Sequence, residues 1–192
     1  MIPKPVMIVM GAAATSGYVE FKYGASMIST PRTTQFAAIT PAVLLGTGFW
    51  AFTHGFIVGK ARTKYAELAR EDGEKDVDER YLLPNLYAQG TSKHAMAFNC
   101  IQRSHQHIFE TYTQAVVGGL AGMISFPIST AISSVMYAIG RVQLSRGYAA
   151  AEGDPKKRYE ARFAIWMWFG FLGNVCLGLG SCGLIMAGKK KL

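Results

Sequence analysis

The stretch FNCIQRSHQHIFE, residues 98–110, leads directly into the apolar segment VVGGLAGMI, residues 116–124. Polar and ionisable side chains therefore lie directly before an apolar run of a kind found in membrane-spanning helices. Arg103, His107 and Glu110 are spaced i, i+4 and i+7, which places them on one face of a helix over about two turns. Ionisable residues at such a position are costly in lipid, so they usually face protein, a cavity or a ligand. A simple Arg–Glu pair at a hydrated helix end is the alternative interpretation.

The composition favours a membrane protein. Of the 192 residues, 50% are hydrophobic and 17% are charged, whereas a soluble domain usually carries about 25% charged residues. The apolar residues form four long runs with few or no charges, at about residues 36–58, 98–126, 128–148 and 163–187. We therefore predict an all-α fold, an integral membrane four-helix bundle, in residues 36–192.

Two segments lie outside this pattern. Residues 1–35 contain only a short apolar part, residues 6–19, which is brief for a membrane span. We expect an N-terminal arm that lies at the membrane interface or packs on another chain. Residues 66–80 are densely charged with both signs, and we expect a polar extension of the first helix or a loop. Such an insertion is ordered only where other groups hold it.

The basic residues indicate a topology. The net charge of +8 could suit a nucleic-acid-binding protein, but the Lys and Arg residues lie in loops beside apolar runs. With four spans, the loops after the first and third spans share one side and hold fourteen of the twenty Lys and Arg residues. The positive-inside rule places this side in the cytosol or its equivalent. We expect an endoplasmic reticulum, mitochondrial or plastid membrane protein that contacts lipid and no nucleic acid.

Several arginines gather on that basic side, where they could ring one site: Arg62, Arg103, Arg141, Arg146 and Arg158. Guanidinium groups bind carboxylates through two parallel hydrogen bonds, and next to a thiol they favour the thiolate. Contact with lipid headgroups is the alternative role for these arginines. The three cysteines form no CxxC pair, and we predict free thiols and no metal site.

Three blocks of the sequence resemble a known family. They are KARTKY at residues 60–65, the stretch at 98–110, and Gly140-Arg141 with Gly147-Tyr148, followed by Asp154-Pro155 and Lys157-Arg158. Together they resemble the MAPEG family, the membrane-associated proteins in eicosanoid and glutathione metabolism, and especially its type-three microsomal glutathione transferases. The resemblance covers about residues 36–190. It implies four helices, a homotrimer with glutathione between neighbouring subunits, and glutathione conjugation to lipophilic electrophiles or reduction of lipid hydroperoxides.

The resemblance also implies roles for individual residues. Six positions match glutathione-binding positions of the family: Arg62, Arg103, His107, Glu110, Arg141 and Tyr148. Arg158 matches the catalytic arginine that stabilises the glutathione thiolate, with Lys157 as the alternative, because the loop here is longer than in the family.

The sequence also departs from the family pattern. His107 stands where the family usually has Asn, Leu144 where it usually has Tyr, and Thr113 where it usually has Pro. Histidine can still donate one hydrogen bond, but leucine can donate none. Three functions therefore remain open. One is an active glutathione transferase or peroxidase, and another is a weak or silent MAPEG-like accessory subunit of a larger membrane complex. The third is a module that only binds a lipid mediator in the same pocket.

Overall fold

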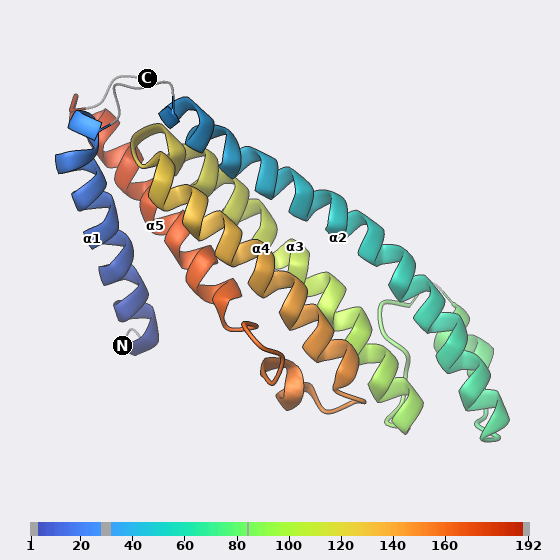
Figure 1. Ribbon diagram of the computed structural model, residues 1–192. Coiled ribbons are helices and arrows are strands. Elements are labelled where there is room, and N and C mark those ends of the chain that lie inside the picture. The colour runs from blue at the N-terminus through green and yellow to red at the C-terminus, as the bar shows by residue number, and fades with distance from the viewer. Residues whose placement is uncertain (1–3, 28–31, 84, 190–192) are drawn as a thin grey trace. The chain divides into compact units, whose positions relative to one another are not determined.

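The computed structural model describes residues 4–27, 32–83 and 85–189, and every regular element in that part of the chain is helical (Figure 1). In chain order the elements are α1 (Lys4–Met27), α2 (Arg32–Glu71), the π-helix η1 (Asp78–Leu82), α3 (Lys93–Ser125), α4 (Pro127–Ala150), the 3-10 helix η2 (Pro155–Tyr159) and α5 (Trp166–Met186). The predicted all-α fold is confirmed.

The four predicted apolar runs fall within α2, α3, α4 and α5 in that order. Among the described residues, two segments are long and apolar enough to cross a membrane by length and composition, Phe36–Glu71 and Trp166–Met186. Helices α3 and α4 are not among these segments, and α3 includes the polar stretch at residues 98–110. Helix α2 continues to Glu71, so the first part of the charged insertion is a polar extension of this helix, one of the two expected forms.

The chain forms two compact units. Unit 1 comprises the described parts of Met1–Thr47, Thr111–Gly140 and Ile165–Leu192. Unit 2 comprises Gly48–Glu110 and Arg141–Ala164. Helices α2, α3 and α4 each contribute residues to both units.

In unit 1, helices approach one another closely at glycines. A Cβ atom on Gly118 of α3 would lie 2.7 Å from the main-chain oxygen of Asn174 on α5. A Cβ atom on Gly170 of α5 would overlap the backbone of Tyr137 on α4. Ser134 adds a polar contact by donating to Asn174 Oδ1 at 3.2 Å. Such packing through small residues is typical of membrane proteins, because lipid offers no hydrophobic force that would bring helices together.

Helix α1 packs along α5 in unit 1 (Figure 1). Its buried side is formed by Val9 and Ala13 and, one turn further, by Gly17, whose Cβ position would lie 3.2 Å from Leu177 of α5. The arm predicted at residues 1–35 is therefore a regular helix over Lys4–Met27. Residues 1–3 and 28–31 of that arm lie outside the described residues.

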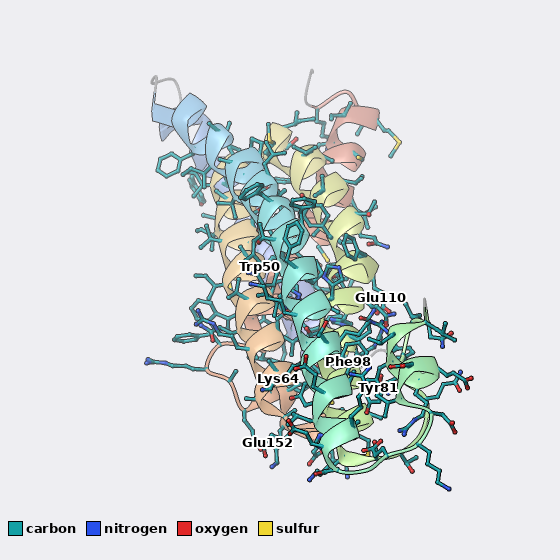
Figure 2. The ribbon with its side chains drawn as sticks, turned by 90° about the vertical axis from the view of Figure 1, so that its right-hand side faces the viewer. Trp50, Lys64, Tyr81, Phe98, Glu110 and Glu152 are labelled. Atoms are coloured by element: carbon teal, nitrogen blue, oxygen red, sulfur yellow. The ribbon has the colours of Figure 1, made fainter. Side chains whose placement is uncertain are left out.

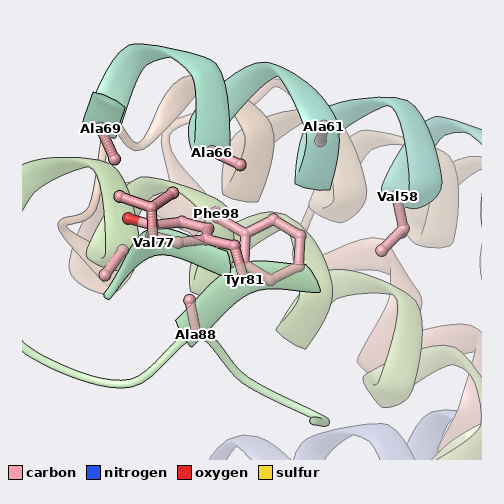
Figure 3. Packing of buried hydrophobic residues seen from close by; sticks show 9 residues of the cluster. Val58, Ala61, Ala66, Ala69, Val77, Tyr81, Ala88 and Phe98 are labelled. Carbon is pink, nitrogen blue, oxygen red and sulfur yellow. The ribbon is translucent and has the colours of Figure 1, made fainter. Parts of the chain in front are cut away.

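Unit 2 has its own hydrophobic core, in which the insertion takes part, that is, the described part of residues 72–92 between α2 and α3 (Figure 3). The insertion lays Tyr81 against Phe98 of α3, with ring centroids 6.3 Å apart and both side chains 0% exposed. Small residues of α2 allow this close approach. The buried members of the cluster are Val58, Ala61, Ala66, Ala69, Val77, Tyr81, Ala88, Ala95 and Phe98.

Arg80 is the polar centre of the insertion. Its Nε donates to the Gln89 main-chain oxygen at 2.8 Å, and its Nη1 donates to Glu74 Oε2 at 2.7 Å. Its Nη2 donates to Ser92 Oγ at 3.2 Å. The ion pair with Glu74 is largely buried, so it is less weakened by solvent than an exposed pair would be.

The two ends of the insertion meet at Asp72. Its carboxylate contacts the Lys93 ammonium and His94 Nε2, each at 2.8 Å. The hydrogen bond from Lys93, and then that from His94, holds the pKa of Asp72 below its usual value, and Asp72 raises the pKa of Lys93. The charged insertion is therefore held by this chain's own residues.

Asn99, in the polar stretch of α3, fastens the insertion through Ala88. Its Oδ1 accepts from the Ala88 amide at 2.8 Å, and its Nδ2 donates to the Ala88 carbonyl at 2.9 Å. We expect Asn99→Ala to destabilise the closed insertion by about 2 kcal/mol, because two main-chain groups lose their partner. Limited proteolysis should then cleave the insertion about 30-fold faster. Gln89→Ala, which changes an exposed side chain, is the control; equal cleavage of the two variants would contradict this role.

Candidate functional site

All seven site residues predicted from the sequence belong to unit 2. Arg62 lies on α2, whereas Arg141 and Tyr148 lie on α4 and Arg158 lies in η2. The other three, Arg103, His107 and Glu110, lie on α3. Figure 2 shows side chains of this unit and labels Glu110 and Phe98 on α3, Lys64 on α2 and Glu152 in the turn after α4.

Arg103 and Glu110 form a paired charge on one face of α3, as their i, i+7 spacing predicts. Arg103 Nη2 donates to Glu110 Oε2 at 2.9 Å, and Nη1 donates to Oε1. The two side chains are 39% and 49% exposed. Exposed pairs contribute little to stability, about 0–1 kcal/mol. The pair therefore presents a positive and a negative group side by side at an accessible surface.

His107 contacts Arg141, which joins α3 to α4 within unit 2. Arg141 is fully buried, and its Nη1 lies 2.5 Å from His107 Nδ1. Because a guanidinium can only donate, Nδ1 must be the acceptor nitrogen, and the ring proton of a neutral His107 then lies on Nε2. Asparagine, the residue that the family usually has at this position, would also offer a hydrogen-bond acceptor to Arg141. His107 therefore preserves the acceptor in a bulkier side chain.

Arg158 is positioned by aromatic rings and by a glycine. Its guanidinium carbon lies 5.6 Å from the centre of the Tyr148 ring and 4.9 Å from that of Tyr159. Its Nη1 donates to the Pro155 oxygen at 2.8 Å. A Cβ atom on Gly147 would overlap the main-chain oxygen of Arg158. Gly147 therefore allows η2 to lie directly against α4.

Three positive charges converge on Tyr148. Its hydroxyl interacts electrostatically with Arg158, Arg103 and Arg141. The same three arginines interact electrostatically with His107. The structure thus brings together six of the seven predicted residues around one position in unit 2, and this arrangement suits an anionic ligand.

Arg62 contacts a different part of unit 2. Its Nη1 donates to the Tyr81 oxygen at 2.6 Å, and its Nη2 donates to the Asn85 oxygen at 2.9 Å. Its guanidinium carbon lies 4.7 Å from the centre of the Phe98 ring. These contacts tie α2 to the charged insertion, and a role for Arg62 in binding a ligand stays a prediction.

Other residues of the 98–110 stretch have structural contacts that the sequence did not indicate. His105 stacks on His54 of α2, with ring centroids 5.5 Å apart and planes 15° apart. The Gln106 side chain accepts a hydrogen bond from the Tyr87 hydroxyl of the insertion. The stretch therefore serves two purposes, since some of its residues hold the insertion and others form the charged site. A motif alone cannot separate these groups, because their partners are distant in sequence.

Leu144 lies on α4 and is 0% exposed. It occupies the position at which tyrosine was expected from the resemblance, and it adds no hydroxyl to the site. Gly147 belongs to the third block that resembles the family, but no role in the site was predicted for it. Its place directly before Tyr148 was the available signal, since a glycine within a helix often marks a close approach of backbones.

A comparison with known families gives the identity of the fold. The MAPEG family model matches residues 40–182. The match covers nearly three quarters of the chain and includes all seven predicted site residues, whereas α1 lies outside it. The chain therefore belongs to the MAPEG family and has its all-helical membrane fold.

Proposed function

We propose that this chain is a membrane glutathione transferase or glutathione peroxidase that acts on lipophilic electrophiles or lipid hydroperoxides. The observation that carries the proposal is the placement of the Arg158 guanidinium over the Tyr148 ring in unit 2. The accessible Arg103–Glu110 pair and the buried contact of Arg141 with His107 lie in the same unit. Membership of the MAPEG family supports a general role of this kind. The 98–110 stretch favours the type-three microsomal glutathione transferases within the family.

The charged groups of unit 2 fit glutathione, which carries two carboxylates, one ammonium and a thiol. Arg103 would bind a carboxylate and Glu110 would bind the ammonium, because their side chains lie together and remain accessible. Arg141 is buried beside His107 and would add to the positive field that attracts the peptide.

Arg158 would stabilise the thiolate. The Pro155 main-chain oxygen accepts one hydrogen bond from the Arg158 guanidinium, which has five N–H donors. The Tyr148 and Tyr159 rings hold the guanidinium in place. A positive charge beside a thiol lowers the cost of losing its proton. The bound thiolate would supply an electron pair that forms a C–S bond as the leaving group departs. With a hydroperoxide it would form an S–O bond as the O–O bond breaks, and the alkoxide would take a proton and leave as the alcohol. A second glutathione would then reduce the sulfenic acid, with formation of the disulfide and water.

The assembly belongs to the same proposal. By family resemblance, three copies of the chain would form a homotrimer, with glutathione between neighbouring subunits. The lipophilic second substrate would then reach the site from the lipid that surrounds the helices.

Glutathione binding to the purified chain in detergent tests the proposal. We expect Arg103→Leu to weaken binding about 10- to 100-fold, because a charge-assisted hydrogen bond contributes about 1.5–3 kcal/mol. Arg162→Leu removes an exposed arginine of the segment before α5 and is the matched control. Titration calorimetry would measure both variants. A wild-type chain that binds no glutathione at millimolar concentration would reject the proposal.

One observation favours a second candidate function. Leu144 is fully buried and offers no hydrogen-bond donor to a ligand. If a tyrosine at this position is needed to orient glutathione, the chain would act as an accessory subunit of a larger membrane complex. Copurification from native membranes with unrelated membrane proteins at constant stoichiometry would support this candidate, and a self-associated trimer would oppose it.

A further inference from the structure

We propose that α1 is a fifth membrane-spanning helix, added to the MAPEG fold alongside α5 and fixed in place by Glu20. Helix α1 has 24 residues, and at 1.5 Å per residue it is about 36 Å long. The hydrocarbon core of a membrane is about 30 Å thick. Between Lys4 and Glu20 the sequence contains no Asp, Glu, Lys or Arg. The helix as a whole is therefore long enough to cross. Its uncharged part is residues 5–19, and α1 is less apolar than the two candidate spans Phe36–Glu71 and Trp166–Met186.

The position of α1 beside α5 determines the depth of α1 in the membrane. Near its start, Val9 lines a groove of about 380 Å³ together with Phe169 and Gly173 of α5. Near its end, Phe21 lines a second groove of about 290 Å³ together with Leu184 of α5. Contacts thus advance in the same direction along both helices, so α1 and α5 run parallel. Because α5 is itself a candidate membrane span, a helix that follows it from Phe169 to Leu184 lies at the same depth in the membrane.

The outward side of α1 matches a lipid environment. Ile8 is 71% exposed and Met7 is 51% exposed, while Val19 on a later turn is 48% exposed. A helix face of this kind is unfavourable in water but favourable against hydrocarbon. The two grooves beside α1 are also lined mainly by apolar and small side chains. Lipid acyl chains are the occupants that this surface fits.

Glu20 explains how an acidic residue is accommodated near the end of such a helix. Its carboxylate accepts hydrogen bonds from the Ile128 amide at 2.8 Å, the Ser129 amide at 3.0 Å and the Ser129 hydroxyl at 2.7 Å. These amides belong to the first turn of α4, where main-chain N–H groups have no partner within the helix. A carboxylate at this position is stabilised by the hydrogen bonds and by the helix dipole. Glu20 therefore fastens α1 to the start of α4.

The end of α1 carries the residues expected at a membrane surface. The Lys22 ammonium lies 5.1 Å from the centre of the Tyr23 ring and 5.7 Å from that of Tyr18. Tyrosine and lysine are favoured where hydrocarbon gives way to headgroups. Because α1 is parallel to α5, its Lys4 end lies on the membrane side of Trp166, and its Lys22 end lies on the side of Met186.

A topology experiment on the full chain tests the crossing. An epitope is placed at the N-terminal end, at Glu152 in the turn before η2, or at the C-terminal end, and access of protease is compared in sealed and opened vesicles. We expect the N-terminal and Glu152 epitopes on one side and the C-terminal epitope on the other. If the N-terminal epitope shares a side with the C-terminal one, α1 does not cross and the proposal is overturned.

A second measurement tests the role of Glu20. We expect Glu20→Ala to lower the Tm of the detergent-solubilised chain by about 2–4 °C, since a lost helix cap costs about 1 kcal/mol. Glu67→Ala removes an exposed carboxylate from α2 and is the control. If both variants have the same Tm, Glu20 does not fix α1 to α4, and this part of the proposal fails.

Discussion

Replacing Arg158 with alanine is expected to lower kcat/KM for glutathione conjugation about 100- to 1,000-fold, the usual loss when one preorganised donor to a developing anion is removed. On the proposed function, this guanidinium favours the thiolate, whereas Arg103 binds a carboxylate and Arg141 adds to the positive field. Glutathione affinity should therefore change much less than the rate. Turnover with a lipophilic electrophile and binding by calorimetry, measured on the same preparation, would separate the two effects.

The pH dependence provides an independent check on Arg158→Ala. Without the guanidinium, the bound thiol must ionise nearer to its ordinary range, so the rate of the variant should recover as the pH rises. Lys157→Ala is the matched control, because Lys157 is the exposed neighbouring cation. A large loss in Lys157→Ala with little change in Arg158→Ala would transfer the thiolate-stabilising role to Lys157.

The helices could be predicted largely because charge is excluded from membrane spans. Uncharged runs gave the positions of α2 to α5, but the ends of helices depended on contacts. Helix α2 reaches Glu71 because Ala66 and Ala69, in a charged segment, are 0% exposed against the insertion. A sequence window contains the charges of this segment and not the partners that bury its alanines. The sequence therefore left a helical extension and a loop as alternatives for this segment.

Helix α1 was harder to predict for a related reason. Its apolar part is short, and the helix continues through Glu20 and Lys22. Glu20 is accommodated by amides at residues 128 and 129, more than one hundred positions away in sequence. No local pattern could supply that partner, so the sequence indicated only an arm at the membrane interface or packed on another chain.

The contacts of the site residues are also of two kinds, those that local spacing predicts and those that depend on partners distant in sequence. The i, i+7 spacing of Arg103 and Glu110 placed them on one helical face, where they pair. The contact of His107 with Arg141 joins two helices, and Gly147 controls how closely Arg158 approaches α4. Contacts of this second kind arise from tertiary packing, which spacing along one helix cannot predict.

Gly140→Ala is expected to destabilise the folded chain by about 3 kcal/mol or more, the upper part of the range for overpacked sites. A Cβ atom on Gly140 of α4 would overlap the main chain of Met167 on α5. A flexible side chain could move aside, but a helix backbone cannot, so the two helices must separate. Arg141 follows directly in the sequence, and we expect glutathione binding to weaken as well. Unfolding in mixed detergent micelles would measure the stability.

Gly46→Ala on α2 is the matched control, because its Cβ position has no atom within 4 Å. There the added methyl meets open space, and the better helix propensity of alanine should stabilise the chain by about 0.5–1 kcal/mol. The same substitution should thus have opposite signs at the two glycines. This difference separates backbone packing from propensity, since propensity alone would favour alanine at both. A Gly140→Ala chain as stable as wild type would mean that α4 and α5 do not approach each other at backbone distance.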